Sequence, residues 1–205
     1  MKIIKTGSKG NAVVYHDSIL VDIGVSYNLI KDYNLKLICL THEHHDHINI
    51  TTLTKYMHEH KNCRIACPEW MFEYVKDIEN VDILDMYDFY KYNEFIISPF
   101  PLMHGDVENC GYRIIKDNYK IIHATDTNTL DHISAKNYNL YAIEHNYKTD
   151  VIDKYIQDKK EKGVYSYEVS AKERHLSYEK AQAWINKNNI NGRVVELHKS
   201  TQNYE

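Results

Sequence analysis

Residues with metal-binding side chains crowd one short segment of the chain. Residues 41–47 read THEHHDH and directly follow the apolar run 37–40. His42 and His44 are two residues apart, so their imidazoles point to the same side of an extended backbone. Asp46 and His47 come where the chain turns toward a predicted helix, so their side chains can diverge toward a second point. Imidazole and carboxylate are ligands of zinc, manganese and iron in proteins, so this segment predicts a metal site.

A solvated, histidine-rich loop is the alternative interpretation of this segment. The chain has 13 histidines among 205 residues. At the chain's own frequencies, the pattern H-x-H-x-D-H would arise by chance in roughly 0.4% of such sequences. Its position directly after an apolar strand lowers that figure further, which favours metal binding.

Short strands and amphipathic helices alternate along the rest of the chain and must position this segment. Strands are predicted at residues 2–5, 12–15, 19–22, 36–40, 63–67, 81–84, 94–98, 101–104, 111–115, 119–123, 140–144 and 193–197. Helices are predicted at residues 47–60, from Pro68 to residue 76, at 149–162 and at 177–188, the last with Ser177 as N-cap. This order predicts an α/β fold, a four-layer αββα sandwich forming one domain over residues 1–205, with loops gathered along one edge.

Composition excludes several classes of protein. Hydrophobic residues make up 43% and charged residues 26%, a globular rather than a disordered balance. The net charge of −4 excludes the polybasic surface of a DNA-coating protein. The apolar runs are too short to span a bilayer and the first residues lack a secretory pattern, so we expect a cytoplasmic protein with no membrane partner. We expect the four cysteines to be reduced thiols; they are Cys39, Cys63, Cys67 and Cys110. We expect Cys63 and Cys67 to be core residues, because their C-x3-C spacing has no matching second pair.

The pattern of residues 42–47 resembles the H-x-H-x-D-H signature of the metallo-β-lactamase superfamily. Residues 124–127 (ATDT) resemble the family's T-D-T-G, with Asn128 in place of the glycine, and residues 174–177 (RHLS) resemble its H-L-S. The resemblance implies the αββα fold and two divalent metal ions, with zinc expected and manganese possible. The implied ligands are His42, His44 and His104 for the first ion, Asp46, His47 and His175 for the second, and Asp126 as the bridge.

The resemblance also implies a hydrolytic reaction. A hydroxide held between the two ions would attack the substrate, with Asp46 acting from the metal site and His198 assisting the leaving oxygen. Two carboxylates among seven ligands leave two divalent ions with net positive charge. That charge favours an anionic phosphodiester over a neutral amide. Asp22 matches a family aspartate that supports the metal loop.

Four further residues are candidates for substrate contacts, with a purely structural or solvated role as the alternative for each. His145 and Tyr147 lie where related proteins tend to have E-A-N-H, displaced by two positions. Ser200 lies in residues 197–203 (LHKSTQN), which resemble a C-terminal loop of a nuclease-like branch of the family. Asn11 ends the glycine-containing residues 7–11 (GSKGN), which permit a tight loop beside the metals.

Three functions are open at this stage. The favoured one is a metal-dependent phosphodiesterase or nuclease acting on DNA, RNA or nucleotides, with a cyclic-nucleotide phosphodiesterase of the phage counter-defence type as a variant. The second is hydrolysis of a lactone, thioester or lactam, and the third is a metal-stabilised binding module, which a closed four-ligand site would suit better. A homodimer is possible from the resemblance. Lysines at 154, 159, 160 and 162 could offer a basic helix face to nucleic acid or simply be solvated.

Overall fold

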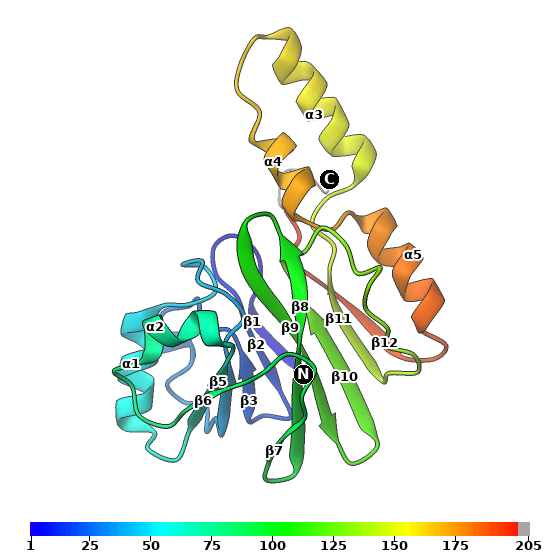
Figure 1. Ribbon diagram of the computed structural model, residues 1–205. Coiled ribbons are helices and arrows are strands. Elements are labelled where there is room, and N and C mark those ends of the chain that lie inside the picture. The colour runs from blue at the N-terminus through cyan, green and yellow to red at the C-terminus, as the bar shows by residue number, and fades with distance from the viewer. Residues whose placement is uncertain (201–205) are drawn as a thin grey trace. The chain divides into compact units, whose positions relative to one another are not determined.

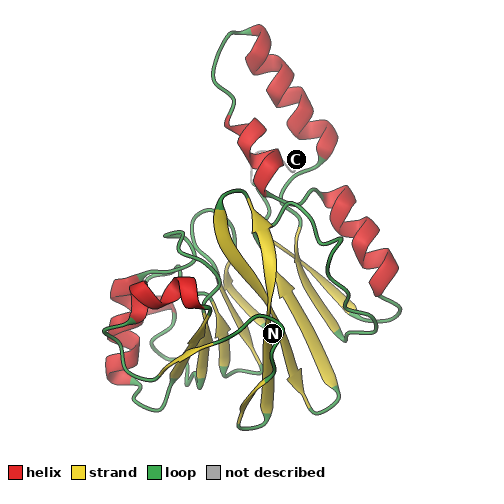
Figure 2. Cartoon of the chain, viewed as in Figure 1, coloured by secondary structure: helices red, strands yellow, loops and turns green. Residues whose placement is uncertain are grey.

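The computed structural model describes residues 1–200, which form two six-stranded sheets and five α-helices (Figures 1 and 2). The first sheet has the order β1-β2-β3-β4-β5-β6, with strands at Lys2–Lys5, Ala12–Tyr15, Ile19–Val21, Leu37–Cys39, Arg64–Cys67 and Val81–Ile83. The second has the order β12-β11-β10-β9-β8-β7; in chain order β7 to β12 are Tyr90–Tyr92, Phe95–His104, Val107–Lys116, Tyr119–Ala124, Leu140–Glu144 and Arg193–Leu197. The predicted α/β fold class is confirmed.

The helices are short, and none of those described is long and apolar enough to cross a bilayer. They are α1 (Ile50–Glu59), α2 (Phe72–Val75), α3 (Thr149–Glu161), α4 (Tyr167–Arg174) and α5 (Tyr178–Asn188), with 3-10 turns η1 (Tyr27–Leu29) and η2 (Glu69–Met71).

The chain divides into two compact units. Unit 1 comprises Met1–Asn93 and Ile97–Phe100, and unit 2 comprises Glu94–Ile96 and the chain from Pro101 onward. The single domain expected from the sequence stays a prediction.

Unit 1 has a hydrophobic core between its sheet and α1. Leu20 and Ile38 of the sheet are fully buried, and Leu53 and Tyr56 of α1 pack in the same cluster. The spacing of these α1 residues is the helical periodicity that the sequence predicts. The helix nevertheless begins at Ile50 rather than at residue 47, because the Asn49 side chain accepts the backbone N–H of Thr52 at 3.0 Å and caps the helix there.

Unit 2 contains the parallel strands β10, β11 and β12, with β9 antiparallel to β10. The predicted hairpin turn at residues 117–118 is confirmed, with Asp117 at φ 50°. Residues 94–98 and 101–104 were predicted as two strands, but β8 runs unbroken from Phe95 to His104. The N–H groups of residues two apart point to the same edge of a strand. Pro99 and Pro101 therefore remove hydrogen-bond donors from one edge of β8 only, and the strand continues through both.

Helix α5 covers part of the sheet of unit 2, and Ser177 caps it by accepting the backbone N–H of Lys180 at 3.2 Å, as predicted. Its Trp184 is buried, and the indole N–H donates to the carbonyl of Ile133 at 2.9 Å. The contacts of this apolar face therefore anchor the loop after β10 as well as the helix.

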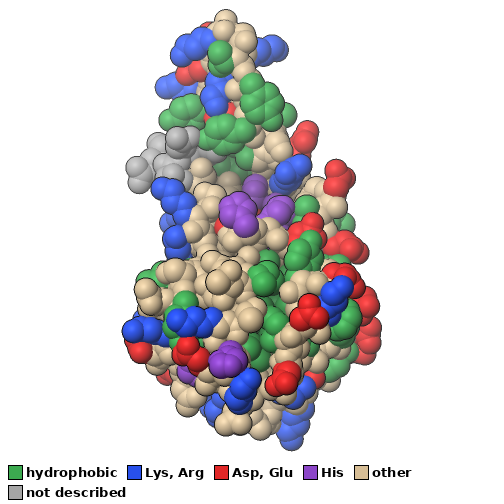
Figure 3. Space-filling view, turned by 90° about the vertical axis from the view of Figure 1, so that its left-hand side faces the viewer, with side chains coloured by type: hydrophobic (Ala, Val, Ile, Leu, Met, Phe, Trp, Pro, Cys, Tyr) green, Lys and Arg blue, Asp and Glu red, His purple; other side chains and the backbone are tan. Residues whose placement is uncertain are grey.

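Helices α3 and α4 form a pair that buries little of its own surface. Ile152 is the one buried residue of α3, and Glu168 is the one buried residue of α4. Apolar and basic side chains lie next to one another on this part of the chain, at the top of Figure 3; the exposed apolar ones include Tyr155, Val164, Tyr165, Tyr167 and Val169. The sequence did not predict α4 because it lacks an apolar stripe. The possible homodimer stays a prediction.

All four cysteines are free and buried, which confirms that Cys63 and Cys67 are core residues.

Candidate metal centre

In unit 1, two neighbouring parallel strands deliver the first polar residues to one edge of the sheet. β3 and β4 are parallel, so their carboxyl ends meet at the same edge. Asp22 follows β3, and its backbone N–H donates to the carbonyl of Cys39 in β4 at 2.9 Å. The Asp22 carboxylate in turn accepts the N–H of Thr41 at 3.0 Å and its hydroxyl at 2.9 Å. Asp22 therefore fixes the start of residues 41–47, as the family resemblance implies.

Asp22 also orients His47, the last histidine of the motif. The Nδ1–H of His47 donates to Asp22 Oδ2 at 2.6 Å, which leaves the lone pair on Nε2. This carboxylate–histidine contact is the arrangement that orients metal-ligating imidazoles in proteins. Burial raises the pKa of Asp22, while His47 and Thr41 act in the opposite direction.

Asn11 lies against the same segment. Its amide nitrogen is 2.8 Å from His47 Nε2 and 3.3 Å from Asp46 Oδ2, and its backbone N–H donates to the Asp46 carbonyl at 2.6 Å. The Asp46 Oδ2 atom lies 3.7 Å from His47 Nε2. Asn11 thus contacts two predicted ligands, and its predicted contact with substrate stays a prediction.

The first two motif histidines place ring nitrogens side by side. His42 Nε2 is 3.0 Å from His44 Nδ1, and the other ring nitrogen of His42 lies 3.0 Å from the Thr41 hydroxyl. Two imidazole nitrogens at this distance must share a proton or a cation, because two lone pairs would repel. His42 is 1% exposed, so bulk water has little access to these two nitrogens. This donor pair fits a divalent ion.

In unit 2, four strands end at one edge of the sheet, and an ionisable side chain lies at or just after each end. β10, β11 and β12 are parallel, and β8 runs in the same direction because β9 lies antiparallel between it and β10. Their carboxyl ends therefore meet at the same edge. The residues delivered in this way are His104 at the end of β8, Asp126 after β10, Glu144 at the end of β11 and His198 after β12.

Four of the side chains of unit 2 form a compact donor cluster. Ligand atoms of Asp126, Glu144, His175 and His198 all lie within 4.8 Å of one another. Glu144 is fully buried. One of its oxygens accepts the backbone N–H of Thr127 at 2.9 Å, and the other lies 2.7 Å from His175 Nδ1. Burial opposes ionisation of Glu144, but the contacts with His175 and His198 outweigh burial and lower its pKa, so the cluster holds a carboxylate.

His104 and His198 present the same atom to the same carboxylate oxygen. Nε2 of His104 lies 3.9 Å from Asp126 Oδ1, and Nε2 of His198 lies 3.4 Å from it. The Nδ1–H of His104 donates to the Arg174 carbonyl at 3.1 Å, and Nδ1 of His198 lies 3.0 Å from the Asn146 amide. Burial lowers the pKa of His104, which favours the neutral imidazole that binds metals.

His175 is placed differently. Its Nδ1 faces both Glu144, at 2.7 Å, and Asp126 Oδ1, at 3.5 Å. Burial opposes its protonation, but the two carboxylates outweigh burial and raise the pKa of His175 above its usual value. Its side chain is 17% exposed, compared with 5% for His198. His175 is therefore the partly open member of a carboxylate–histidine pair.

Hydrogen bonds of two asparagine side chains fix the loop that carries Asp126. Asp126 has φ 60°, and the Asn109 amide donates to its carbonyl at 2.6 Å and to that of Thr125 at 3.0 Å. The Asn128 amide donates to the Glu173 carbonyl at 2.9 Å. This contact gives the asparagine a structural purpose at the position where the family pattern has glycine.

Three of the predicted substrate-contacting residues belong to unit 2. His145 is fully buried; its ring nitrogens contact the Ile143 carbonyl at 3.0 Å and the Gln182 amide at 3.1 Å, and burial lowers its pKa. Tyr147 is 2% exposed, and burial raises its pKa to about 12. The backbone N–H of Ser200 donates to the Asn146 carbonyl at 2.9 Å. The substrate contacts of all three stay predictions, and residues 201–203 of the C-terminal motif (TQN) lie outside the described residues.

Three residues of these sites were not singled out from the sequence. Glu144 ends an entirely buried strand, and an acidic residue at such a strand end is a usable signal. Asn109 lies within β9 and carries no local signal. Gly24 packs on the motif segment of unit 1, where a Cβ atom would lie 1.7 Å from the Asp46 carbonyl oxygen, so any larger residue would displace the segment.

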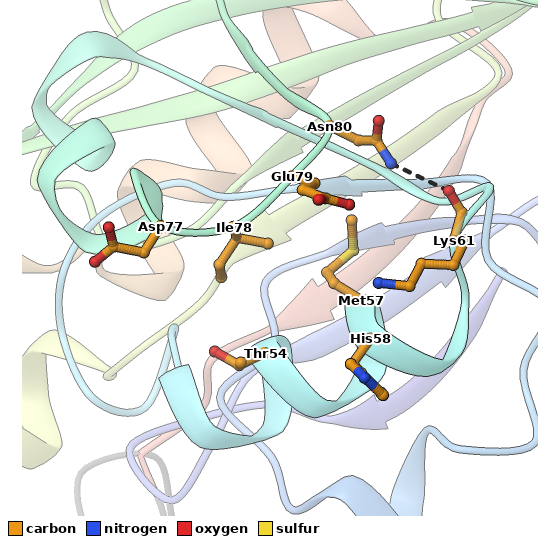
Figure 4. Close-up of a pocket in the computed structure, with 8 residues that line it drawn as sticks. All are labelled: Thr54, Met57, His58, Lys61, Asp77, Ile78, Glu79 and Asn80. Atoms are coloured by element: carbon orange, nitrogen blue, oxygen red, sulfur yellow. Dashed lines mark hydrogen bonds between the residues drawn. The ribbon is translucent and has the colours of Figure 1, made fainter.

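A separate hollow of about 210 Å³ lies in unit 1 beside α1 (Figure 4). Met57 and Ile78 line it, and the positive charge of Lys61 is set against Asp77 and Glu79. Within residues 1–200, the side chains that could hold a metal ion lie elsewhere. The described residues that line this hollow therefore do not form a further metal site.

Comparison with known proteins identifies the family to which this chain belongs. Residues 27–198 match the profile of the beta-lactamase superfamily domain. The chain belongs to the metallo-β-lactamase superfamily. No curated protein matched its sequence.

Solved structures share the fold at low sequence identity. The metallo-β-lactamase fold protein YhfI from Bacillus subtilis is 16% identical with a TM-score of 0.71, covering 96% of this chain and 84% of its own. Human tRNase Z, short form, is 15% identical with a TM-score of 0.63, covering 99% and 93%. A diphosphatase from the PhnP family is 15% identical with a TM-score of 0.64, covering 93% and 72%. These likenesses show the metallo-β-lactamase fold.

Proposed function

We propose that this superfamily member is a divalent-metal-dependent hydrolase that cleaves phosphodiester bonds of nucleic acid or nucleotides. The observation that carries the proposal is the pair of ligand sets, each at a strand edge and each with buried carboxylates that orient its histidines. We infer that residues 42–47 of unit 1 and the cluster of unit 2 bind two divalent ions, with zinc favoured and manganese possible. Two related folds, a tRNase Z and a PhnP-family diphosphatase, carry names of phosphate-bond enzymes, which supports this substrate class.

Bound divalent ions would supply Lewis acidity and lower the pKa of coordinated water toward neutrality. The protein's own part is to hold each ligand atom in place. In unit 1, Asp22 fixes Nε2 of His47 as the ligand nitrogen. In unit 2, the Arg174 carbonyl does the same for Nε2 of His104. A metal site whose ligands are oriented in this way loses little entropy on binding the ion.

The roles of His175 and His198 can be divided by their contacts. The sequence led us to expect His175 as the ligand and His198 as the proton donor. The contacts in unit 2 favour the exchange of these roles, because Nε2 of His198 faces Asp126 as Nε2 of His104 does. His175 has its Nδ1 held by Glu144 and a raised pKa, so it is suited to stay protonated and give a proton to the leaving oxygen.

The experiment is a substrate panel run with Zn²⁺ and with Mn²⁺. It comprises linear DNA, structured RNA, cyclic mononucleotides, bis-p-nitrophenyl phosphate and the lactam nitrocefin. The proposal expects turnover of at least one phosphodiester and none of nitrocefin. Turnover of the lactam alone would replace the proposal with hydrolysis of a carboxylic substrate. Metal binding with no turnover of any compound would favour the metal-stabilised binding module.

A further inference from the structure

Arg174 and Lys180 are basic side chains of unit 2 that form no ion pair with a carboxylate among residues 1–200. Arg174 ends α4, directly before His175, and Lys180 lies in the first turn of α5; both are exposed. No described carboxylate therefore offsets the positive charge of either side chain near the donor cluster.

Two other lysines in this part of the chain are neutralised. Lys159 of α3 pairs with Glu168 at 2.6 Å, and Lys172 of α4 pairs with Asp153 at 2.5 Å. What sets Arg174 and Lys180 apart from these two lysines is that neither forms an ion pair with a carboxylate of residues 1–200.

Arg174 is fixed next to one predicted ligand. Its carbonyl accepts the Nδ1–H of His104 at 3.1 Å. Its side chain lies over Gly105, where a Cβ atom would be 3.2 Å from Arg174 Nε and 3.3 Å from Arg174 Cγ. Gly105 has φ 62°, so glycine serves both the turn after β8 and the close approach of the guanidinium stem.

Lys180 is fixed next to another predicted ligand. Its Nζ donates to the carbonyl of Asn128, two residues after Asp126, at 3.3 Å. The Asn128 amide donates to the carbonyl of Glu173, the neighbour of Arg174, at 2.9 Å. Asn128 therefore links the two cations, and both border the loop that carries Asp126.

We propose that Arg174 and Lys180 bind a second phosphate of the substrate, adjacent to the phosphodiester that is cleaved. This inference rests on the proposed function and narrows its substrate class. A guanidinium presents a planar fork that matches phosphate oxygens, and an ammonium adds a mobile point charge. A linear oligonucleotide or a nucleotide with a second phosphate can use both cations. A cyclic mononucleotide carries one phosphate and cannot.

The test compares two ligands that differ by one phosphate, thymidine 3′,5′-bisphosphate and thymidine 5′-monophosphate, by titration calorimetry on the purified protein. The wild type is expected to prefer the bisphosphate by roughly 100-fold, about tenfold from each cation. Arg174→Gln and Lys180→Gln should each reduce this preference by about tenfold, and Arg174→Lys should retain part of it. Lys172→Gln is the matched control, because Asp153 already neutralises that lysine, and it should keep the wild-type preference.

Kinetics give the second readout. Arg174→Gln and Lys180→Gln should each raise the KM for a linear oligonucleotide about tenfold, whereas Lys172→Gln should leave it within a factor of about two of the wild type. A wild type that binds both ligands equally, or variants that behave like Lys172→Gln, would overturn the inference. A wild type that cleaves no phosphodiester would overturn the proposed function, whereas the ligand preference would still report on the two cations.

Discussion

Replacing Glu144 with alanine removes the acceptor at the centre of the unit 2 cluster. The carboxylate is fully buried and contacts four donors. Two are the backbone N–H groups of Thr127, at 2.9 Å, and Leu176, at 3.3 Å. The other two are Nδ1 of His175, at 2.7 Å, and Nδ1 of His198, at 3.3 Å.

The loss of stability in Glu144→Ala can be worked out from the hydrogen-bond donors that lose their acceptor. A buried N–H without an acceptor costs about 1–3 kcal/mol, and Glu144→Ala leaves two of them. Loss of the carboxylate beside the imidazoles adds to this, so we expect the free energy of unfolding to fall by about 3–5 kcal/mol. Glu144→Gln keeps the shape and one acceptor oxygen, and should cost about 1–2 kcal/mol.

Urea denaturation followed by circular dichroism, with EDTA present to remove metal, measures both losses. Glu173→Ala is the matched control, because the Glu173 side chain is exposed and its loss should change the free energy of unfolding by less than about 0.5 kcal/mol. If Glu144→Ala unfolded at the same urea concentration as this control, the assigned role of Glu144 would be wrong.

Three other predictions concern separate residues. His198→Ala should lower the metal content measured by mass spectrometry, whereas His175→Ala should keep the metal and lower kcat by roughly 10²- to 10⁴-fold; equal metal loss in both would refute the division of roles. The hydrogen bonds from Arg64 lower the pKa of Asp82, so this pair should stabilise the fold above about pH 4 and lose that contribution as pH falls through the lowered pKa. Asp82→Asn should therefore cost about 0.5–1 kcal/mol at pH 7 and less at pH 3, measured by urea midpoints; a loss independent of pH would contradict it. Ser177→Ala should cost about 1 kcal/mol in thermal unfolding, because it removes the N-cap of α5, and an unchanged midpoint would exclude that role.

The motif segment could be predicted from the sequence because its signal is local. Spacing alone placed His42 and His44 on one side, and an apolar strand preceded them. The N-cap Ser177 and the hairpin turn at residues 117–118 were also predictable, since single residue types determine such features.

Non-local features could not be predicted in the same way. Glu144 acquires its role from residues that are about 17 to 54 positions away, which no window of sequence contains. Helix α4 has no apolar periodicity, because its one buried residue is Glu168, paired with Lys159. The continuous β8 was divided in the prediction at Pro99 and Pro101, since local propensity disfavours proline in strands even where one edge tolerates it.

The most direct test of the central claim is a metal titration of activity. The protein is stripped with chelator, and release of p-nitrophenol from bis-p-nitrophenyl phosphate is followed as Zn²⁺ or Mn²⁺ is added back. The account predicts no product without metal and a rate that rises and levels off at two ions per chain. Product formation that is independent of metal, or no product at any metal ratio, would contradict it.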